Sequence, residues 1–269
     1  MTDADLGSRI DGIRQLGSVV RAMTGIAGAR ARTARAQIAA VEGYAAMLAD
    51  AQAQAMAQTS KGDPPPATRP ALVVFCAEQG FVGGFSERVL DGIGEDAAQA
   101  DLFMIGSRGT AIASGRGMAP VWFAAMPSRS ASLPKFADRL LAAVFARGDQ
   151  RAVTVVHTIW SRGQGCVQRL ALSPLPKEKD APASPAPLTN LPAPDLAASL
   201  GLDRLHALLT RAALHAFVAE NEARMAAMAA ASRQIEVELG VLEALARRVR
   251  QEAITAEIIE IAGGAMAGR

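Results

Sequence analysis

One stretch decides the fold of this chain, and it runs from Leu202 to Met266: LDRLHALLTRAALHAFVAENEARMAAMAAASRQIEVELGVLEALARRVRQEAITAEIIEIAGGAM. It contains no proline, and its only glycines are Gly240, Gly263 and Gly264. Helices of globular proteins usually have about three or four turns, whereas a helix of this length would measure roughly 95 Å. The stretch therefore predicts one very long helix.

The apolar residues of this helix recur at alternating spacings of four and three, which is typical of a coiled-coil seam. One row is Asn221, Met228, Ile235, Leu242 and Val249, and the other is Met225, Ser232, Leu239, Ala246 and Ala253. Because several of these residues are small or polar, the partner helix must approach closely.

The other end of the chain offers the partner. Residues 6–58 again contain no proline and carry the same spacing, in the rows Ile10, Gly17, Thr24, Ala31, Ile38, Ala45 and Ile13, Val20, Ala27, Ala34, Val41, Leu48. We predict a long antiparallel coiled coil of an N-terminal helix (residues 1–60) and a C-terminal helix (residues 201–269). An ordinary bundle of alanine-rich helices is the alternative.

The middle of the chain predicts an inserted small Rossmann-like α/β domain at residues 70–173, with a mostly parallel sheet. Short apolar runs indicate strands, and amphipathic runs between them indicate helices. Ser86 is the expected N-cap of the first of these helices. Residues 174–200 are rich in proline and predict a linker. The expected strands are 71–77, 101–106, 120–125, 151–161 and 167–172, and the expected helices are 86–98, 107–117 and 133–147.

Composition excludes several classes of protein. The net charge is only +2, and no apolar run is long enough to span a bilayer. Cys76 and Cys166 lie in apolar strand-like runs, so we expect buried free thiols in a reducing compartment. His157, His206 and His215 lie far apart in the sequence without further ligands at fixed spacing. We therefore expect no metal, no cofactor and no catalytic residues, and a chain on the cytosolic side of a membrane.

The first helix carries a long run of arginines without an intervening carboxylate, from Arg14 through Arg21, Arg30 and Arg32 to Arg35. Such a run is most often a solvated face. Nucleic-acid binding is disfavoured, because no reading module, lysine or aromatic residue accompanies it. The favoured functional interpretation is contact with an acidic protein surface, and replacing Arg21, Arg30 and Arg32 by glutamate should then impair function more than folding.

The turn Gly80-Phe-Val-Gly-Gly84 joins a strand to a helix and suggests a phosphate site. It is followed by no Gly-Lys-Ser/Thr, and the acid of a dinucleotide fingerprint is missing. A structural turn is the favoured interpretation.

Several segments together resemble the F-type ATP synthase γ subunit. The resemblance is carried by Glu220-Asn-Glu-Ala-Arg-Met-Ala-Ala-Met-Ala-Ala-Ala-Ser232 and Arg250-Gln-Glu-Ala-Ile-Thr-Ala-Glu-Ile-Ile-Glu-Ile-Ala-Gly-Gly-Ala265, and by Arg21-Ala-Met23, the turn 80–84 and Asp101-Leu-Phe-Met-Ile-Gly-Ser-Arg-Gly109. These segments cover the chain in the family's order.

The resemblance implies a central rotor shaft without catalytic residues. Its terminal helices would stand inside a hexamer of α and β subunits, and its α/β domain would form the foot against the ε subunit and the c-subunit ring. Such a complex lies peripherally on the cytoplasmic face of the inner membrane. It would couple ion transport to ATP synthesis or hydrolysis at β.

By motif position, the resemblance assigns contacts with the surrounding subunits to a set of residues, each of which is alternatively an ordinary coiled-coil surface residue. Met23 and its basic neighbours would face the acidic lever segments of β, Arg250 and Gln251 would form a polar catch, and Arg224 would lie on the lower coiled coil. The set is Arg21, Met23, Arg30, Arg32, Arg224, Arg250 and Gln251.

The sequence also departs from the family pattern. Glu78 and Gln79 replace an acidic-basic pair, Ser86 replaces an asparagine, Arg21 replaces a lysine, and residues 205–217 lack a tyrosine. These departures favour a divergent γ subunit of an alternative ATPase, coupled to H⁺ or Na⁺. Two other functions remain open: a coiled-coil scaffold or adaptor whose insert binds a ligand, and an enzyme that uses the turn 80–84 for a phosphate.

Overall fold

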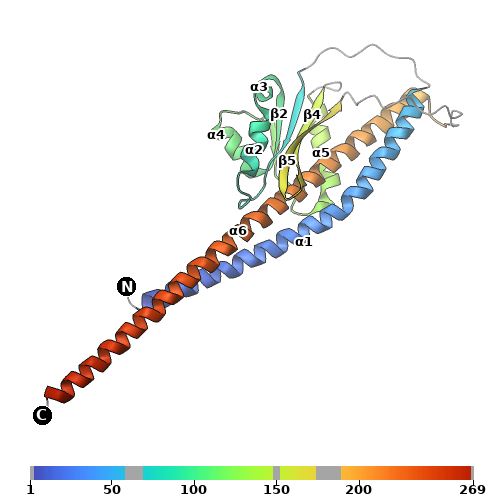
Figure 1. Ribbon diagram of the computed structural model, residues 1–269. Coiled ribbons are helices and arrows are strands. Elements are labelled where there is room, and N and C mark those ends of the chain that lie inside the picture. Colours follow the sequence, from blue (N-terminus) through green and yellow to red (C-terminus); the bar gives the residue numbers. More distant parts are fainter. Residues whose placement is uncertain (1–2, 58–68, 148–151, 174–188, 268–269) are drawn as a thin grey trace. The chain divides into compact units, whose positions relative to one another are not determined.

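The computed structural model describes residues 3–57, 69–147, 152–173 and 189–267. It divides into two compact units, one made of residues 1–26 with 225–269 and the other of residues 27–224. The long helices α1 (Asp3–Met56) and α6 (Ala193–Ala267) contribute to both units. The remaining elements all belong to the second unit (Figure 1).

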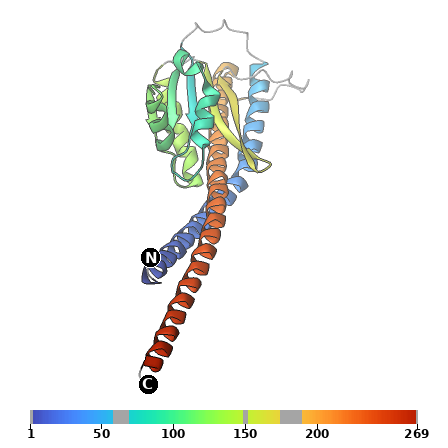
Figure 2. The ribbon, with the colours of Figure 1, turned by 60° about the vertical axis from the view of Figure 1, so that its left-hand side comes forward.

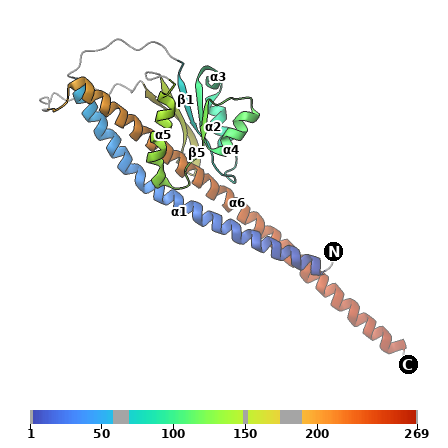
Figure 3. The same ribbon diagram turned by 180° about the vertical axis from the view of Figure 1, so that it is seen from behind.

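The first unit is a two-helix arm. The N-terminal turns of α1 lie alongside α6, and the last turns of α6 continue past the N-terminus of α1 (Figures 1 and 3). Leu6 and Ile10 of α1 form an apolar cluster with Leu242 and Ala246 of α6, all less than a tenth exposed. The ion pair Arg9–Glu238, at 3.0 Å, joins the two helices. They run antiparallel, since Leu6 and Ile10 lie beside Leu242 and Ala246 whereas Gly17 lies beside Ile235.

The close approach predicted for the seam is present in the arm. An added Cβ at Gly17 would lie 3.4 Å from Cγ2 of Ile235. Of the predicted seam residues in this unit, Ala253 is exposed, and it lies in the part of α6 that continues past the described start of α1 at Asp3 (Figure 1).

The same two helices also pair in the second unit, where they pack on the α/β domain. Ala34, Ala45 and Leu48 of α1 share one apolar core with the part of α6 from Leu205 to Val218. An ion pair between Arg35 and Glu222 joins them, and Arg204 donates a hydrogen bond to Gln52 at 3.2 Å. The predicted fold class, long N- and C-terminal helices that pack together around an α/β insert, is confirmed.

The sheet of the α/β domain has five strands in the order β3-β2-β1-β4-β5 (Figure 2). Strands β1, β2, β3 and β4 are parallel, and β5 is antiparallel to β4. Arg162 and Gly163 connect this last pair with positive φ angles of 50° and 81°, as a tight hairpin requires. The strands are β1 (Ala71–Phe75), β2 (Asp101–Ile105), β3 (Trp122–Ala124), β4 (Val153–Ser161) and β5 (Gln164–Ser173).

Both faces of the sheet are covered, as expected for buried parallel strands. Residues of α5, α6 and α1 cover one face, and residues of α2 and α4 cover the other. The α/β helices are α2 (Phe85–Ile93), α3 (Asp96–Gln99), α4 (Ser107–Gly115), the 3₁₀ helix η1 (Ser130–Ser132) and α5 (Leu133–Phe145).

The structure corrects four local predictions. Ser86 is not an N-cap: α2 begins at Phe85, and the Ser86 hydroxyl accepts a hydrogen bond from the backbone N–H of Ala77 at 3.1 Å. The predicted helix 86–98 is broken by Gly94, whose φ is 49°. Cys76 is buried as expected, but Cys166 is exposed, on the edge strand β5.

The fourth correction concerns the start of the C-terminal helix. It begins at Ala193 rather than near Leu202, inside the segment predicted to be a linker. Pro194 is compatible with this start, because proline is tolerated in the first turn of a helix. The residues 174–188 of the predicted linker lie outside the described part of the chain.

Candidate functional site: the arginine face, the exposed apolar row and the carboxylate network

Apart from Arg30, the arginines of α1 fall into two groups. Arg14 pairs with Glu243 of α6 at 2.8 Å within the arm, and Arg35 pairs with Glu222 within the second unit. Arg21 and Arg32 are exposed, and no carboxylate of the described residues lies within ion-pair distance of either. The second group therefore presents charge outward, whereas the first uses it to join the helices.

Arg30 differs from both groups. It is partly buried and lines a small cavity of about 30 Å³ together with Glu78, Glu220 and Arg224. A space of this size holds about one or two water molecules. Arg30 thus adds positive charge next to two carboxylates of its own chain.

A second apolar row runs along α1 within the arm, separate from the seam. Leu16, Val19 and Ile26 are 53%, 53% and 56% exposed, and Met23 lies between them with partial exposure. Their spacing of three, four and three places them on one face of the helix. The row was missed in the sequence, although this spacing, offset from the seam, was available to find it.

The last turns of α6 present another exposed apolar surface. Every residue from Gln251 to Ile261 is exposed, and Ile254, Ile258 and Ile261 are 57%, 61% and 67% exposed. Arg250 lies at the start of this segment and donates a hydrogen bond to the carbonyl of Ala246 at 3.3 Å. Arg250 and Gln251 are therefore both at the surface of the arm.

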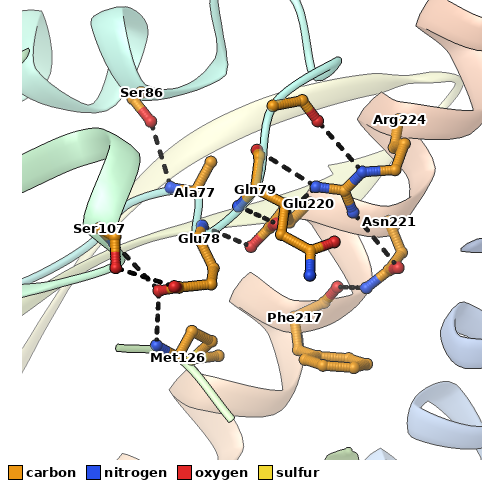
Figure 4. A network of polar contacts seen from close by, with 11 residues as sticks. Ala77, Glu78, Gln79, Ser86, Ser107, Met126, Phe217, Glu220, Asn221 and Arg224 are labelled. Carbon is orange, nitrogen blue, oxygen red and sulfur yellow. Dashed lines mark hydrogen bonds and ion pairs between the residues drawn. The ribbon is translucent and has the colours of Figure 1, made fainter. Parts of the chain in front are cut away.

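Arg224 has a different environment from the other predicted contact residues. Its side chain is buried, with 4% of the residue exposed, and it donates to a Glu220 oxygen at 2.7 Å (Figure 4). It also donates to the backbone carbonyls of Gln79 and Gly80, each at 3.2 Å. The guanidinium is used inside the second unit and is not presented outward.

Glu220 completes this network from the same helix. Its two carboxylate oxygens accept hydrogen bonds from the consecutive backbone N–H groups of Glu78 and Gln79, both at 3.2 Å (Figure 4). Charged hydrogen bonds in a buried position are among the strongest that side chains make. The loop after β1 is thereby bound to α6 in two ways. Its backbone N–H groups donate to Glu220, and its backbone carbonyls accept from Arg224.

Glu78 extends the network across the carboxyl ends of the parallel strands. It accepts from the backbone N–H and the hydroxyl of Ser107 at 3.0 and 2.8 Å, and from the N–H of Met126 at 2.9 Å. The N-terminus of α4 attracts anions, and here a carboxylate of the chain itself occupies it. The side chains of Glu78 and Glu220 thus lie at the edge of the sheet where many α/β domains bind ligands, and a cavity of about 80 Å³ remains beside them, lined by Gly80, Arg108 and their neighbours.

The described residues contain no group of three or more His, Cys, Asp or Glu side chains arranged to hold a metal ion. Burial raises the pKa of the Cys76 thiol to about 12, so this thiol stays protonated and is a poor nucleophile. None of the helices in the described ranges combines the length and the hydrophobicity that crossing a bilayer requires.

Two histidines that lie far apart in the sequence meet in the core of the second unit. The ring centroids of His157 on β4 and His215 on α6 are 6.0 Å apart, and His215 lies 3.6 Å from a carboxylate oxygen of Glu42. Burial, followed by the charge of His215 and of Arg211, lowers the pKa of His157 to about 3. Burial also lowers the pKa of His215.

We predict that these histidines lower the stability of the folded chain as the pH falls from about 6.5 toward the pKa of His157, about 3. His157 stays neutral in the folded chain, whereas the imidazole of the unfolded chain binds a proton below about pH 6.5. The unfolded state then binds more protons, so each histidine lowers the free energy of unfolding by up to about 1.4 kcal/mol per pH unit as the pH falls. Urea unfolding at pH 7 and pH 5.5 measures this, and His157→Asn should reduce the difference. Equal midpoints at the two pH values would contradict the prediction.

Comparison with known proteins identifies relatives of this chain. A family model described as ATP synthase matches residues 2–267. The ATP synthase gamma chain of Frankia casuarinae is 32% identical over 288 aligned residues, covering 96% of this chain and 95% of that protein. That of Moorella thermoacetica is 28% identical and covers 97% of both chains.

Solved structures agree in fold. A chain of the Euglena gracilis mitochondrial ATP synthase, in a structure of its OSCP/F1/c-ring, has a TM-score of 0.66 at 13% identity, covering 99% of this chain and 94% of its own. A chain of the central stalk and c-ring structure from Tetrahymena thermophila has a TM-score of 0.56 at 13% identity and covers 80% of this chain. The resemblance inferred from the sequence motifs is confirmed: the chain belongs to the ATP synthase γ-chain family, the family of the central rotor stalk.

Proposed function

We propose that this chain turns as the non-catalytic shaft of a rotary ATP synthase, peripheral on the cytoplasmic face of the inner membrane. The observation that carries the proposal is the surface of α1, where Arg21 and Arg32 are exposed without an ion pair to any described carboxylate and where Leu16, Val19 and Ile26 form an exposed apolar row. Catalysis would belong to the β subunits, and α, β, ε and the c ring would be the partners. Residues 70–173 would serve as the foot, against ε and the c ring.

The chemistry of the outer surface supports a contact that forms and breaks. Exposed ion pairs contribute only about 0–1 kcal/mol each, so an acidic lever meeting Arg21 or Arg32 is held weakly. The apolar row around Met23 adds contact area without a directional bond. A shaft that stops repeatedly at different subunits needs such reversible contacts. Arg224, in contrast, is committed within the chain, and we do not include it among the contacts.

The end of α6 would make the second contact, higher in the hexamer. Arg250 and Gln251 would form the polar catch, and the exposed isoleucines beyond them would lie against an apolar surface of the α and β subunits.

The proposal is tested by reversing charge at Arg21 and Arg32 together. The variant with Arg21→Glu and Arg32→Glu should fold and assemble normally, because both side chains are exposed and none of the described carboxylates pairs with them. Ion pumping driven by ATP hydrolysis should fall by about tenfold, because two attractive contacts with an acidic lever become repulsive, at roughly 0.5–1 kcal/mol each. Purified complexes reconstituted in vesicles give the pumping rate per ATP hydrolysed.

The matched control carries Arg108→Glu and Arg129→Glu, which change the same charge on exposed positions of the α/β domain. It should leave contact with β intact. Unchanged pumping in the variant with Arg21→Glu and Arg32→Glu would show that these arginines are only a solvated face. Failure of the wild-type chain to form an ATP-hydrolysing complex with α and β would favour the scaffold alternative.

A further inference from the structure

The hydrogen bonds of Glu220 and Arg224 join α6 to the loop after β1, in addition to the apolar packing between α6 and the sheet. We propose that these two residues are positioning residues that fix the α/β domain on α6, so that torque applied to the domain reaches the helix without slack. This inference rests on the proposed rotor function. We call the pair and its four backbone partners on Glu78, Gln79 and Gly80 the clasp.

The first argument is directionality. The other described contacts between α6 and the sheet are made largely by alanine, leucine and valine side chains from Leu205 to Val218. Apolar packing resists separation, but it is not directional, and packed helices slide past one another by about 1–2 Å in many conformational changes. Hydrogen bonds to consecutive backbone groups have definite directions, so they oppose sliding and rotation of the helix against the sheet.

The second argument is completeness. The clasp uses both oxygens of Glu220 on the N–H groups of Glu78 and Gln79, while Arg224 takes the carbonyls of Gln79 and Gly80. Glu220 and Arg224 are one turn apart on the helix and neutralise each other at 2.7 Å, with only 7% and 5% of their side chains exposed. A buried charge pair is tolerable only when its remaining bonding positions are satisfied, and here the loop backbone satisfies them.

The third argument is continuity with the rest of the domain. The loop held by the clasp begins at Glu78, whose own carboxylate binds the start of α4 at Ser107 and the segment after β3 at Met126. Figure 4 shows this chain of contacts running from Met126 through Glu78 to Glu220 and Arg224. Displacing the domain against α6 would therefore strain polar contacts on three connected segments.

Two variants test the clasp in the complex assembled with α and β subunits. Glu220→Gln keeps the shape of the side chain but loses its charge and one acceptor, and Arg224→Lys keeps the charge but loses the planar fork. We expect hydrogen exchange at the amides of Glu78 and Gln79 to accelerate by about tenfold or more, since a hydrogen bond to a charged group is lost. Glu222→Gln is the matched control, because it changes a glutamate of the same helix, α6, that forms an ion pair with the exposed Arg35 of α1.

The second readout measures slack directly. A bead attached through the exposed thiol of Cys166, on β5, reports the angular fluctuation of the domain while the hexamer is immobilised and waits for ATP. The clasp variants should give a broader angular distribution than the wild type and Glu222→Gln, at the same ATP hydrolysis rate per complex. A purely structural role would leave the distribution of assembled complexes unchanged.

Two results would overturn the inference. One is rapid exchange of the Glu78 and Gln79 amides in the wild-type complex, a measurement that does not depend on whether any variant folds. The other is an unchanged angular distribution in a variant whose amides do exchange faster. Failure of the wild-type chain to assemble with α and β would instead remove the proposed function, and amide exchange in the free chain would still report the clasp.

Discussion

Alanine at position 109 is expected to disrupt the α/β domain. Gly109 lies in the first turns of α4, where an added Cβ would stand 2.0 Å from Cβ and 2.7 Å from Sγ of Cys76. The Cβ of Cys76 is attached directly to the backbone just after β1, and the residue is buried. It can therefore move aside only if the sheet or the helix α4 shifts. Overpacking in a tight core costs about 1–3 kcal/mol and occasionally more, and this overlap belongs to the severe cases.

The measurement is urea unfolding of the purified chain, followed by circular dichroism and by the fluorescence of the tryptophans. Gly109→Ala should lower the free energy of unfolding by about 3 kcal/mol or more, and it should also reduce the soluble yield. Gly115→Ala in the same helix is the matched control, because an added Cβ there meets nothing within 4 Å. Equal stability of the two variants would show that α4 does not pack on β1 as closely as described.

Shortening Leu242 to alanine is expected to open the end of the arm. Leu242 is 5% exposed and is one of the four buried residues of the cluster that joins the start of α1 to α6. A buried leucine changed to alanine costs about 2–5 kcal/mol. Besides this narrow seam, the first turns of α1 are held to α6 by the exposed ion pairs of Arg9 and Arg14, which contribute only about 0–1 kcal/mol each. The loss of Leu242 should therefore favour separation of these turns from α6.

Hydrogen exchange of residues 3–20 measures this opening. Exchange in the Leu242→Ala variant should be faster by about thirtyfold or more, the equivalent of about 2 kcal/mol. Val241→Ala changes the neighbouring residue, which is 64% exposed, and should leave exchange near the wild-type rate. If both variants exchange alike, Leu242 does not hold the seam.

The seam was largely readable from the sequence. The alternation of four and three predicted which residues of α1 and of α6 lie on the seam, and Ile10, Val20, Leu242 and Ala246 are indeed buried. Periodicity is a local property of one helix, so it can be recognised in the sequence even when the partner helix is not known. The parallel strands were predicted for a similar reason, because strands buried on both faces are continuously apolar.

The roles of the charged residues were not readable in this way. Arg21 and Arg224 both looked like surface residues of a coiled coil, yet one is exposed and the other is among the most buried charged groups of the second unit. The difference arises because the loop after β1 packs against α6 at Glu220 and Arg224, and the spacing of residues along α6 does not predict this contact. The exposure of Cys166 likewise follows from β5 being an edge strand.

By itself the sequence determined the two long helices, the faces on which they pair and the α/β insert, because each rests on a repeating local pattern of apolar residues. Only the tertiary structure decided which charges point outward and which are used within the chain. Charged side chains do not recur along a helix in a pattern that predicts their contacts. Its environment is set by whichever distant segment packs beside it, as the loop at Glu78 and Gln79 does for Glu220.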